Sequence, residues 1–419
     1  MKKVLKKSVV REVEDDVVQL GLAGVLRRGL RELVFDAGMK QLHEILEEER
    51  AAVCGPRYAQ GPQRQARRMG HAPGELVLGG RRVQVSRPRA RTLDGQEVLL
   101  PSWAEFRRED PLTERAVEQM MLGISTRKYD RSLEPVAPGL QTRGTSKSAV
   151  SRRFVAATKA TVDRWLKRDL SAIDMVVLMI DGMHVEEHVL LVALAIDSDG
   201  KKHVLGLHEG ATENAASCRA LISELQDRGL RTDKVILAVL DGSKALAKAV
   251  TDAFGKRLLI QRCQAHKLRN VEEHLPEVMR PSVRNAMREA YRSRNVERAK
   301  RLLGNLARRL QDEHPGAAKS LEEGLDETLT VMAFGLPEWL ERFLSTTNAI
   351  ENLIGTAREG SSRVKRWRNA DMIIRWTAAG LIEAERHFRK VRDHRGMKML
   401  LATLNKKLEQ PLAPAAQLA

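Results

Sequence analysis

The sequence predicts an α/β protein, with a mixed sheet in the order β-β-β-α-β-α-β, helices packed on it, and largely helical regions on both sides. Two observations predict this class. Short apolar runs bounded by Asp-Gly pairs recur between residues 171 and 264, which is typical of buried strands. Apolar residues at helical spacing separate these runs and continue, with no strand pattern, from residue 265 onward. With 419 residues, the chain is expected to form two to four domains.

Composition narrows the class of protein. Lys and Arg number 72 against 55 Asp and Glu, so the formal net charge is +17, and 42% of the residues are hydrophobic. No apolar run approaches the roughly 20 residues of a membrane-spanning helix, and no export signal follows the basic start of the chain. Cys54, Cys218 and Cys263 are far apart and odd in number, which favours a reducing compartment. We therefore expect a cytoplasmic protein, without membrane contact, whose partner is an acidic polymer.

The positive charge is unevenly distributed along the chain. Residues 57–170 hold 23 basic and 12 acidic residues, a net charge of +11, and residues 351–419 hold 14 and 7, a net charge of +7. Residues 171–260 hold 10 and 13, a net charge of −3. This pattern is expected of a catalytic centre built on carboxylates between segments that bind a polyanion. For any one segment, a solvated basic helix is the alternative.

The first 109 residues are predicted to form two regions. Residues 1–56 have apolar side chains at helical spacing and are expected to form amphipathic helices that pack on the body or dimerise. Residues 57–109 contain two alternating runs around Gly79-Gly80, which is the signal of a β-hairpin. The arginines beside this hairpin are candidate contacts to backbone phosphates, and a solvated basic hairpin is the alternative.

A helix-turn-helix-like DNA-binding domain is predicted over residues 110–170. Residues 113–130 would supply the earlier helix, and a capped turn before residue 148 leads into a second one in which Val150, Phe154 and Val155 are expected to face inward. The outward residues that we expect to contact DNA are Lys147, Ser151, Arg152 and Arg153. Small polar and basic residues at this end are what a recognition helix presents to a groove. A plain helical hairpin is the alternative.

A mixed sheet with helices packed on it is predicted to begin after residue 171. The expected elements are strands at 175–180, 189–196 and 202–208, a helix at 212–228, a strand at 235–240, a helix at 243–254 and a strand at 257–261. Residues 265–345 show no strand pattern and are expected to form about five or six helical elements, and residues 346–419 are expected to be helical to the end of the chain.

Two aspartates stand where the predicted strands end. Asp181 and Asp241 each follow a buried strand and precede a glycine. A carboxylate there lies at the rim of an open α/β sheet, where such folds place their ligand chemistry. Two of them on neighbouring strands suit Mg²⁺ or Mn²⁺, and a pair of ions can activate a nucleophile and stabilise the departing oxygen of a phosphodiester. For either Asp-Gly alone, an ordinary strand-ending turn is the alternative.

At these motifs the chain resembles a known family, the bacterial Mutator-like insertion-sequence transposases. The family's features are two Asp-Gly pairs, a Cys-x-x-His signature, and a glutamate flanked by asparagines. The matching residues are Asp181-Gly182, Asp241-Gly242, the run 261–270 with Cys263 and His266, and the run 348–352 with Glu351. The similarity covers most of the chain and is densest over residues 179–269 and 346–376.

The resemblance implies an RNase H-like sheet that carries a DDE carboxylate triad. Residues 171–264 would form the first part of this catalytic core, residues 265–345 a helical insertion, and residues 346–419 the final core helix and a basic helical tail. Asp181, Asp241 and Glu351 would then be the catalytic residues and would bind two Mg²⁺ (or Mn²⁺) ions. His266 would lie near the scissile phosphate, with Cys263 packed behind it, although a purely structural histidine is a close alternative. One Cys and one His make a zinc site improbable. The further DNA contacts expected in these segments are Arg262, Lys267, Arg269, Asn348, Lys365, Arg366, Trp367 and Arg368.

The activity implied by the resemblance is DNA transposition. The enzyme would bind the terminal inverted repeats of its own element, hydrolyse a strand at the end, and let the freed 3′ hydroxyl attack a target phosphodiester. The implied partners are double-stranded DNA and a second copy of the chain, with no small-molecule substrate. Two rivals stay open: a structure-selective nuclease or resolvase of the same class, and a non-catalytic DNA-binding protein descended from a transposase.

Overall fold

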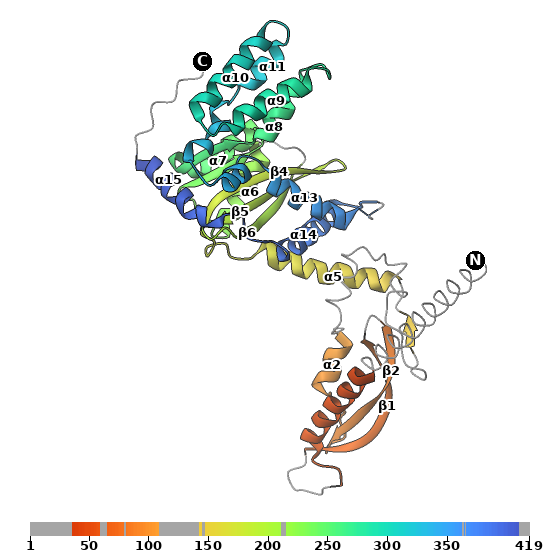
Figure 1. The fold of residues 1–419 in the computed structure, drawn as a ribbon. Coiled ribbons are helices and arrows are strands. Elements are labelled where there is room, and N and C mark those ends of the chain that lie inside the picture. Colours follow the sequence, from red (N-terminus) through yellow and green to blue (C-terminus); the bar gives the residue numbers. More distant parts are fainter. Residues whose placement is uncertain are drawn as a thin grey trace, which may run out of the picture. The chain divides into compact units, whose positions relative to one another are not determined.

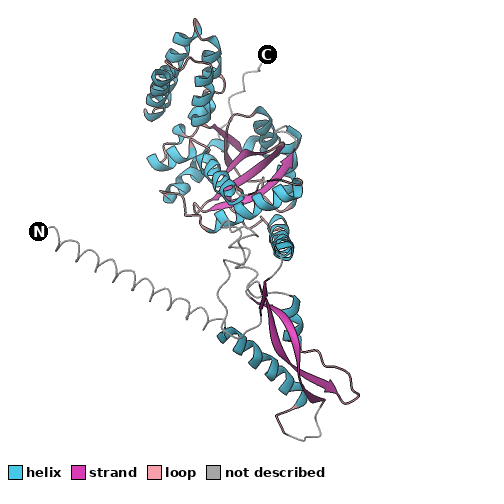
Figure 2. Cartoon of the chain, turned by 90° about the vertical axis from the view of Figure 1, so that its right-hand side faces the viewer, coloured by secondary structure: helices cyan, strands magenta, loops and turns pink. Residues whose placement is uncertain are grey.

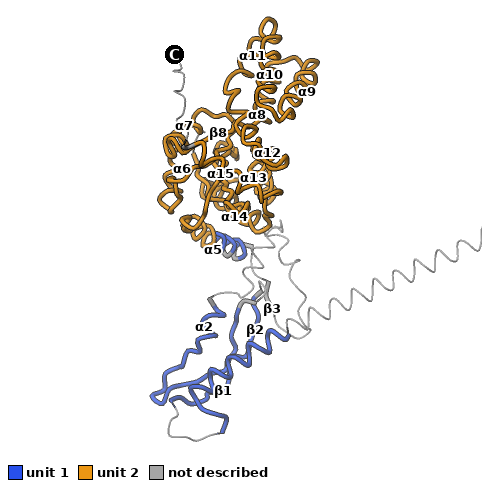
Figure 3. The backbone as a smooth tube through the Cα atoms, turned by 60° about the vertical axis from the view of Figure 1, so that its left-hand side comes forward, with its two compact units in different colours: residues 1–158 blue, residues 159–419 orange. Residues whose placement is uncertain are grey.

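The structure, a computed structural model, describes residues 36–58, 65–78, 81–108, 142–144, 147–210, 215–362, 364 and 366–409. The chain divides into two compact units, residues 1–158 and 159–419 (Figure 3). The helices predicted before residue 36 and the segment 113–130 of the helix-turn-helix-like domain lie outside the described residues. No helix in the described part of the chain is long and apolar enough to cross a membrane.

The first unit is built on a long β-hairpin. Strands β1 (Ala66–Leu78) and β2 (Arg81–Thr92) pair antiparallel, β3 (Thr142–Gly144) pairs with β2, and helix α2 (Pro101–Arg108) follows the hairpin (Figure 1). A helix at residues 36–54 precedes it. The hairpin predicted around Gly79-Gly80 is therefore confirmed. Apolar side chains from these elements form a small core, whose buried members are Leu42, Leu46, Leu76, Val83, Leu100 and Trp103.

Helix α5 (Lys147–Leu166) spans the boundary between the units. Val150 and Phe154 are buried, as predicted, because residues four apart lie on one face of a helix. The prediction for Val155 was wrong: its side chain is 39% exposed. One residue further along a helix turns about 100° away from that face, and this places Val155 on the solvent side.

The second unit contains a sheet with helices around it (Figure 2). The sheet is mixed and five-stranded, with the strand order β6-β5-β4-β7-β8. Its strands are β4 (Met175–Val185), β5 (His188–Asp197), β6 (Lys202–Gly210), β7 (Ile236–Leu240) and β8 (Leu258–Arg262). The first three pair antiparallel, whereas β7 lies parallel to β4 and β8 parallel to β7. Helices α6 (Ala215–Asp227) and α7 (Lys244–Phe254) connect the later strands. The predicted α/β class and the predicted succession of elements are both present.

The sheet is covered on both faces, which explains its nearly continuous apolar strands. In β4, Leu178 and Ile180 pack with residues of α6 and α7, whereas Val177 and Met179 pack in a second cluster with residues of α13 (Asn348–Ser361) and α14 (Ala370–Arg386). Successive side chains of a strand point to opposite faces. Because both faces are buried, almost every position of β4 and β5 must be apolar.

The first strand is longer than predicted. We expected it to end at Ile180, but β4 runs through Asp181 and Gly182 to Val185. The reason is its antiparallel partner: Asp181 pairs with Val192, and the ladder continues to the turn that begins after Val185. Asp181 therefore lies within a strand, while Asp241 follows directly after β7, as predicted.

Helices make up the rest of the second unit. They are α8 (Gln264–Glu273), α9 (Arg280–Arg292), α10 (Val296–Gln311), α11 (Pro315–Glu322), α12 (Glu338–Leu344), α13 (Asn348–Ser361), α14 (Ala370–Arg386) and α15 (Met397–Glu409). Helices α8 to α11 share a core of their own. The continuous helix predicted from residue 346 to the end is interrupted. Asn369 starts a new helix because its side chain accepts a hydrogen bond from the backbone N–H of Met372, 3.0 Å away.

Candidate active site

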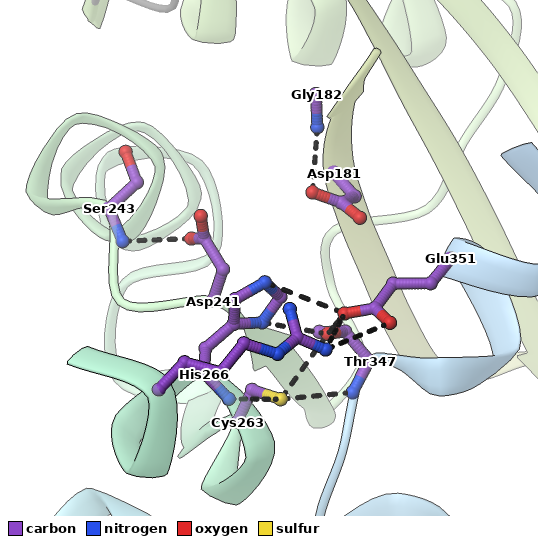
Figure 4. Close-up of polar contacts among 9 residues, drawn as sticks. Asp181, Gly182, Asp241, Ser243, Cys263, His266, Thr347 and Glu351 are labelled. Atoms are coloured by element: carbon purple, nitrogen blue, oxygen red, sulfur yellow. Dashed lines mark hydrogen bonds and ion pairs between the residues drawn. The ribbon is translucent and has the colours of Figure 1, made fainter. Parts of the chain in front are cut away.

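Two aspartates lie at the same level on neighbouring strands of the sheet. Strands β4 and β7 are parallel, and Met179 is in register with Val239, so Asp181 and Asp241 each come two residues after a paired position. Adjacent strands are about 4.8 Å apart. Each carboxylate accepts a nearby backbone N–H: Oδ1 of Asp181 from Gly182 and Oδ1 of Asp241 from Ser243, both at 2.8 Å (Figure 4).

The electrostatics of Asp181 show that acidic groups gather around it. The pKa of this carboxyl is raised to about 6, chiefly by burial; the charges of Asp241 and Glu351 also raise it, while the Gly182 N–H and the charge of His266 lower it. Repulsion of this kind arises only between neighbouring charges. The three carboxylates therefore form one cluster that is short of positive charge.

Gly242 is required by the close approach of Arg262. Its φ is +111°, a conformation that side chains rarely adopt, and a Cβ added there would lie 2.5 Å from Nε of Arg262. The Arg262 side chain is almost fully buried and donates to the backbone oxygen of Glu323 at 3.0 Å. The glycine after Asp241 thus lets an arginine pack directly behind the carboxylate-bearing turn.

The third carboxylate comes from helix α13. Glu351 lies 3.4 Å from Nε2 of His266 and 3.4 Å from a guanidinium nitrogen of Arg269, and the Thr347 hydroxyl is 3.4 Å from its Oε1 (Figure 4). His266 and Arg269 come from α8, which begins directly after β8. Two positive groups from the start of α8 therefore hold the glutamate at the sheet.

Cys263 is buried and contacts residues of both α8 and the segment before α13. Its sulfur accepts hydrogen bonds from the backbone N–H of His266 at 3.5 Å, and from the backbone N–H and hydroxyl of Thr347 at 3.3 Å each. Burial raises the pKa of the Cys263 thiol, but the hydrogen bonds from His266 and Thr347 outweigh that effect and lower it overall. The side chain is fully enclosed, which indicates a structural part for this thiol.

Thr347 connects Cys263 and His266 with Glu351, which lies on α13. Its side chain is completely buried, and Oγ1 lies 3.2 Å from Nδ1 of His266 as well as close to Cys263 and Glu351. A hydroxyl has one proton to donate. If that proton goes to the sulfur of Cys263, Oγ1 can accept one from Nδ1 of His266, and Nε2 of His266 then faces Glu351. The contact with the Cys263 side chain raises the pKa of His266, which favours the doubly protonated ring.

Two residues that we expected to contact DNA are buried. Lys267 is 1% exposed, and its Nζ donates to the backbone oxygens of Ser320 and Glu323, at the end of α11. Arg262 binds Glu323 as well. The prediction for both is therefore wrong: their charges are used inside the protein, where they attach the end of the helical insertion to the sheet.

Gln261 makes a similar attachment that the sequence did not lead us to expect. Its side-chain amide donates to the backbone oxygen of Thr328 at 2.9 Å, and its oxygen accepts from the N–H of Val331 at 2.8 Å. Gln261 is completely buried. The Cys-x-x-His signature and the residues around it therefore fix where the chain returns from the insertion, a few residues before Glu351. Their spacing does not show this, because the partners lie 53 to 84 residues further along the chain.

The other predicted DNA contacts lie in different surroundings. Arg152 and Ser151 on α5, Asn348 on α13, and Arg366 and Arg368 are exposed, whereas Trp367 is partly buried and packs against the core of the second unit. Arg269 is half exposed and is bound to Glu351. The side chains of Lys147, Arg153 and Lys365 lie outside the described residues.

The donor set of the cluster suits a hard cation. Asp181, Asp241 and Glu351 offer only carboxylate oxygens, and their mutual repulsion would be relieved by a divalent ion. Their oxygens do not all approach within 4.8 Å of one another, because Glu351 is turned toward His266 and Arg269.

Among the described residues, the group whose ligand atoms do meet that limit is His43, Glu47 and His71, in the first unit. There Glu47 is already neutralised by Arg50 and Arg68, at 2.5 and 3.2 Å. Two guanidinium groups beside this carboxylate oppose a dication. This cluster of the first unit is therefore poorly suited to hold a divalent ion.

Comparison with known proteins gives one consistent result. The chain is 26% identical over 368 residues to the transposase for insertion sequence element ISRM5 of Rhizobium meliloti (strain 1021), covering 86% of this chain and 88% of that protein. It is 30% identical over 243 residues to the transposase for IS6120 of Mycolicibacterium smegmatis, covering 56% and 72%. The transposase for IS256 in transposon Tn4001 of Staphylococcus aureus is 24% identical over 352 residues, covering 81% and 87%.

A family model described as Transposase, Mutator family, matches residues 16–391. That match includes the whole five-stranded sheet, the helical insertion, and all three carboxylates of the cluster. It also confirms the family resemblance inferred from the Asp-Gly pairs and the Cys-x-x-His signature. The chain belongs to the Mutator family of transposases.

Proposed function

We propose that this transposase is a DDE enzyme with an RNase H-like core. In this proposal it binds the terminal inverted repeats of its own insertion sequence, cleaves a strand at each end, and joins the freed 3′ ends to target DNA. The catalytic residues are Asp181, Asp241 and Glu351, and a dimer acts on double-stranded DNA.

The observation that carries the proposal is the convergence of three carboxylates from distant parts of the chain. Asp181 lies within β4, Asp241 after β7 and Glu351 on α13, and the charges of the last two raise the pKa of the first. Clustered acidic groups of like charge oppose folding, so their presence on a built scaffold favours a function for them. Perturbed carboxyl groups are common at structural ion-pair sites too, but this cluster contains more carboxylates than cations close enough to pair with them.

Asp181, Asp241 and Glu351 would hold two Mg²⁺ or Mn²⁺ ions. Bound there, the ions would supply Lewis-acid activation of the nucleophile and neutralise the departing oxygen of the phosphodiester. The protein's own part is to position groups and balance charge, because phosphoryl transfer needs little covalent chemistry from the enzyme.

Glu351 has the largest rearrangement to make. Its carboxylate is held by His266 and Arg269, and binding an ion requires it to turn toward Asp181. His266 and Arg269 would then be left with N–H groups directed at the site. Both are suited to donate hydrogen bonds to an oxygen of the scissile phosphate. The negative charge of that phosphate would replace the charge of Glu351, which these two groups contact when no DNA is bound.

The Asp181→Asn substitution tests the proposal. We expect it to abolish magnesium-dependent strand cleavage of DNA that carries the element's ends, while affinity for that DNA stays within about twofold, because the amide keeps its shape but loses its charge. The matched control is Asp199→Asn, an exposed aspartate in the β5–β6 turn. Undiminished cleavage by the Asp181→Asn protein would rule out the assignment.

Strand joining separates this proposal from its nearest rival. A structure-selective nuclease with the same carboxylates would cleave but would not join a 3′ end to a second duplex. A non-catalytic descendant would bind end DNA and neither cleave nor join it. Supplying end DNA with a free 3′ hydroxyl and a circular target, and looking for joined product in Mg²⁺, separates the transposase from both rivals, and the strand-cleavage assay separates the two rivals from each other.

A further inference from the structure

A strongly basic segment lies between helices α14 and α15. Residues 386–398 contain six Lys and Arg against one Asp. Arg386 pairs with Glu383. The other five basic side chains are exposed, and none forms an ion pair within the part of the chain that the structure describes; they are Arg389, Lys390, Arg392, Arg395 and Lys398. These five charges are therefore free to meet an external anion.

The backbone that carries these charges is firmly held. Val391 and Met397 are 3% and 0% exposed, and the Val391 N–H donates to the backbone oxygen of Gly200 at 2.9 Å. Gly396 is buried so closely that a Cβ added there would lie 2.8 Å from Leu340. The buried residues Val391, Gly396 and Met397 alternate with the exposed cations. The cations therefore have a defined arrangement on the surface.

An exposed tryptophan joins this segment to helix α12. Trp339 is 47% exposed, and the guanidinium carbon of Arg392 lies 4.1 Å from the centre of one of its rings, with that of Arg342 at 5.7 Å. A guanidinium stacked on an aromatic ring uses its flat face, so its N–H groups at the edge stay available. Trp339 thus orients two arginines, and we call Arg342, Trp339 and the five cations of residues 389–398 the basic surface.

The point at which Val391 holds this segment is far from Asp181. Val391 is hydrogen-bonded to Gly200, in the turn after β5, whose last residue, Asp197, pairs with Met175 at the start of β4. Asp181 is six residues further along β4, which corresponds to about 20 Å at the usual rise of a strand. Side chains carried beside Val391 therefore lie too far from Asp181 to touch a phosphate bound there.

We propose that the basic surface binds the phosphate backbone of duplex DNA flanking the scissile bond. The inference rests on the proposed function, since it assigns a second contact to the same substrate. Duplex DNA carries one charge for about every 1.7 Å of its axis, so it can meet several of these cations at once. A second copy of this chain is a poor occupant, because its net charge is also positive.

The test compares how DNA binding depends on salt. Changing Arg389, Lys390, Arg392, Arg395 and Lys398 to Gln should weaken binding of the element's end duplex at least about tenfold near physiological salt. It should also reduce the slope of log affinity against log salt by about 0.9 for each phosphate that the protein no longer neutralises. The matched control removes five exposed arginines of α9 and α10 instead: Arg292, Arg298, Arg301, Arg308 and Arg309.

Three outcomes decide the inference. A reduced slope in the surface variant but not in the control supports it, provided both melt at the wild-type temperature; the milder Arg389→Gln, Lys390→Gln pair serves if the larger set does not fold. An unchanged slope and affinity in the surface variant overturns it, and points to an acidic protein as the partner. Cleavage by the wild-type protein is measured in parallel: if that is missing while the slope still falls, the proposed function fails and the DNA contact stands.

Discussion

At the scale of single residues, the least expected finding is the part played by Thr347. Its hydroxyl contacts Cys263, His266 and Glu351, so one buried side chain connects the signature after β8 with the helix that carries the third carboxylate. Nothing in the sequence marks this threonine. Its importance arises because two segments more than 80 residues apart in the chain meet at it.

Removing that hydroxyl should slow the reaction without weakening DNA binding. Thr347→Val keeps the shape but leaves Cys263, His266 and Glu351 without their common partner, and a missing buried hydrogen bond costs about 1–3 kcal/mol. We expect strand cleavage to slow at least about tenfold while DNA affinity changes less than about twofold. Thr347→Ser should restore most of the rate. The control is Thr356→Val, on the exposed side of the same helix. Equal rates for the Val and Ser variants would refute this positioning role.

Asp181 should make the protein less stable as the pH rises. Its folded-state pKa, about 6, is above the ordinary 3.8, so the folded protein keeps a proton that the unfolded chain has released between these values. The free energy of unfolding therefore falls as pH rises through this window. At pH values above this window, the buried charge of Asp181 lowers the free energy of unfolding by at most about 3 kcal/mol.

Asp181→Asn removes that cost. With a chelator present, urea denaturation should show the variant to be about 1–3 kcal/mol more stable than wild type near pH 8, and no more stable near pH 3.5. Asp199→Asn, on the surface, should behave like wild type at both. A constant difference across the pH range would mean that the charge of Asp181 is not what the substitution relieves.

At the scale of elements, the strands were predictable because they are buried on both faces. Continuous apolar runs such as 189–196 leave little choice other than a central strand, and the structure places β5 there. The end of β4 was missed because a polar pair, Asp181-Gly182, interrupts the apolar run while the backbone pairing with β5 continues. Hydrophobic pattern reports burial, whereas pairing depends on a partner strand that the pattern does not reveal.

The turn after β7 depends on its glycine. Gly242→Ala forces a side chain into φ +111° and against Arg262, so we expect a loss of at least about 3 kcal/mol in unfolding free energy. Gly255→Ala is the control: its φ is also positive, but a Cβ there meets nothing within 4 Å. That variant should lose only about 1 kcal/mol. Urea denaturation measures both, and equal losses would show that contact with Arg262 is unimportant.

At the scale of the whole molecule, the surplus of +17 is not spread evenly. Some basic residues that composition alone assigns to DNA, such as Lys267, are buried and donate hydrogen bonds inside the protein. Others gather where no motif pointed, as in residues 386–398. Charge counting therefore predicted the class of partner, but only burial and pairing separate structural cations from those available to a ligand.

The two units should contribute differently to DNA binding. Residues 57–158 hold 19 basic and 10 acidic residues, a net charge of +9, so a protein beginning at residue 159 should bind end DNA with a slope of log affinity against log salt reduced by several units. We expect its melting transition to remain cooperative, because the second unit has its own cores. Wild-type affinity in the shortened protein would contradict a DNA-binding role for the first unit.

The most direct test of the central claim is strand transfer by Glu351 variants. The claim is that Asp181, Asp241 and Glu351 act as one catalytic centre, and Glu351 is the member furthest along the chain. With end DNA carrying a free 3′ hydroxyl and a circular target, Glu351→Gln should give no joined product in Mg²⁺ or Mn²⁺. Glu359→Gln, at an exposed position two turns along the same helix, should join ends at the wild-type rate. Joined product from the Glu351→Gln protein at that same rate would contradict the account.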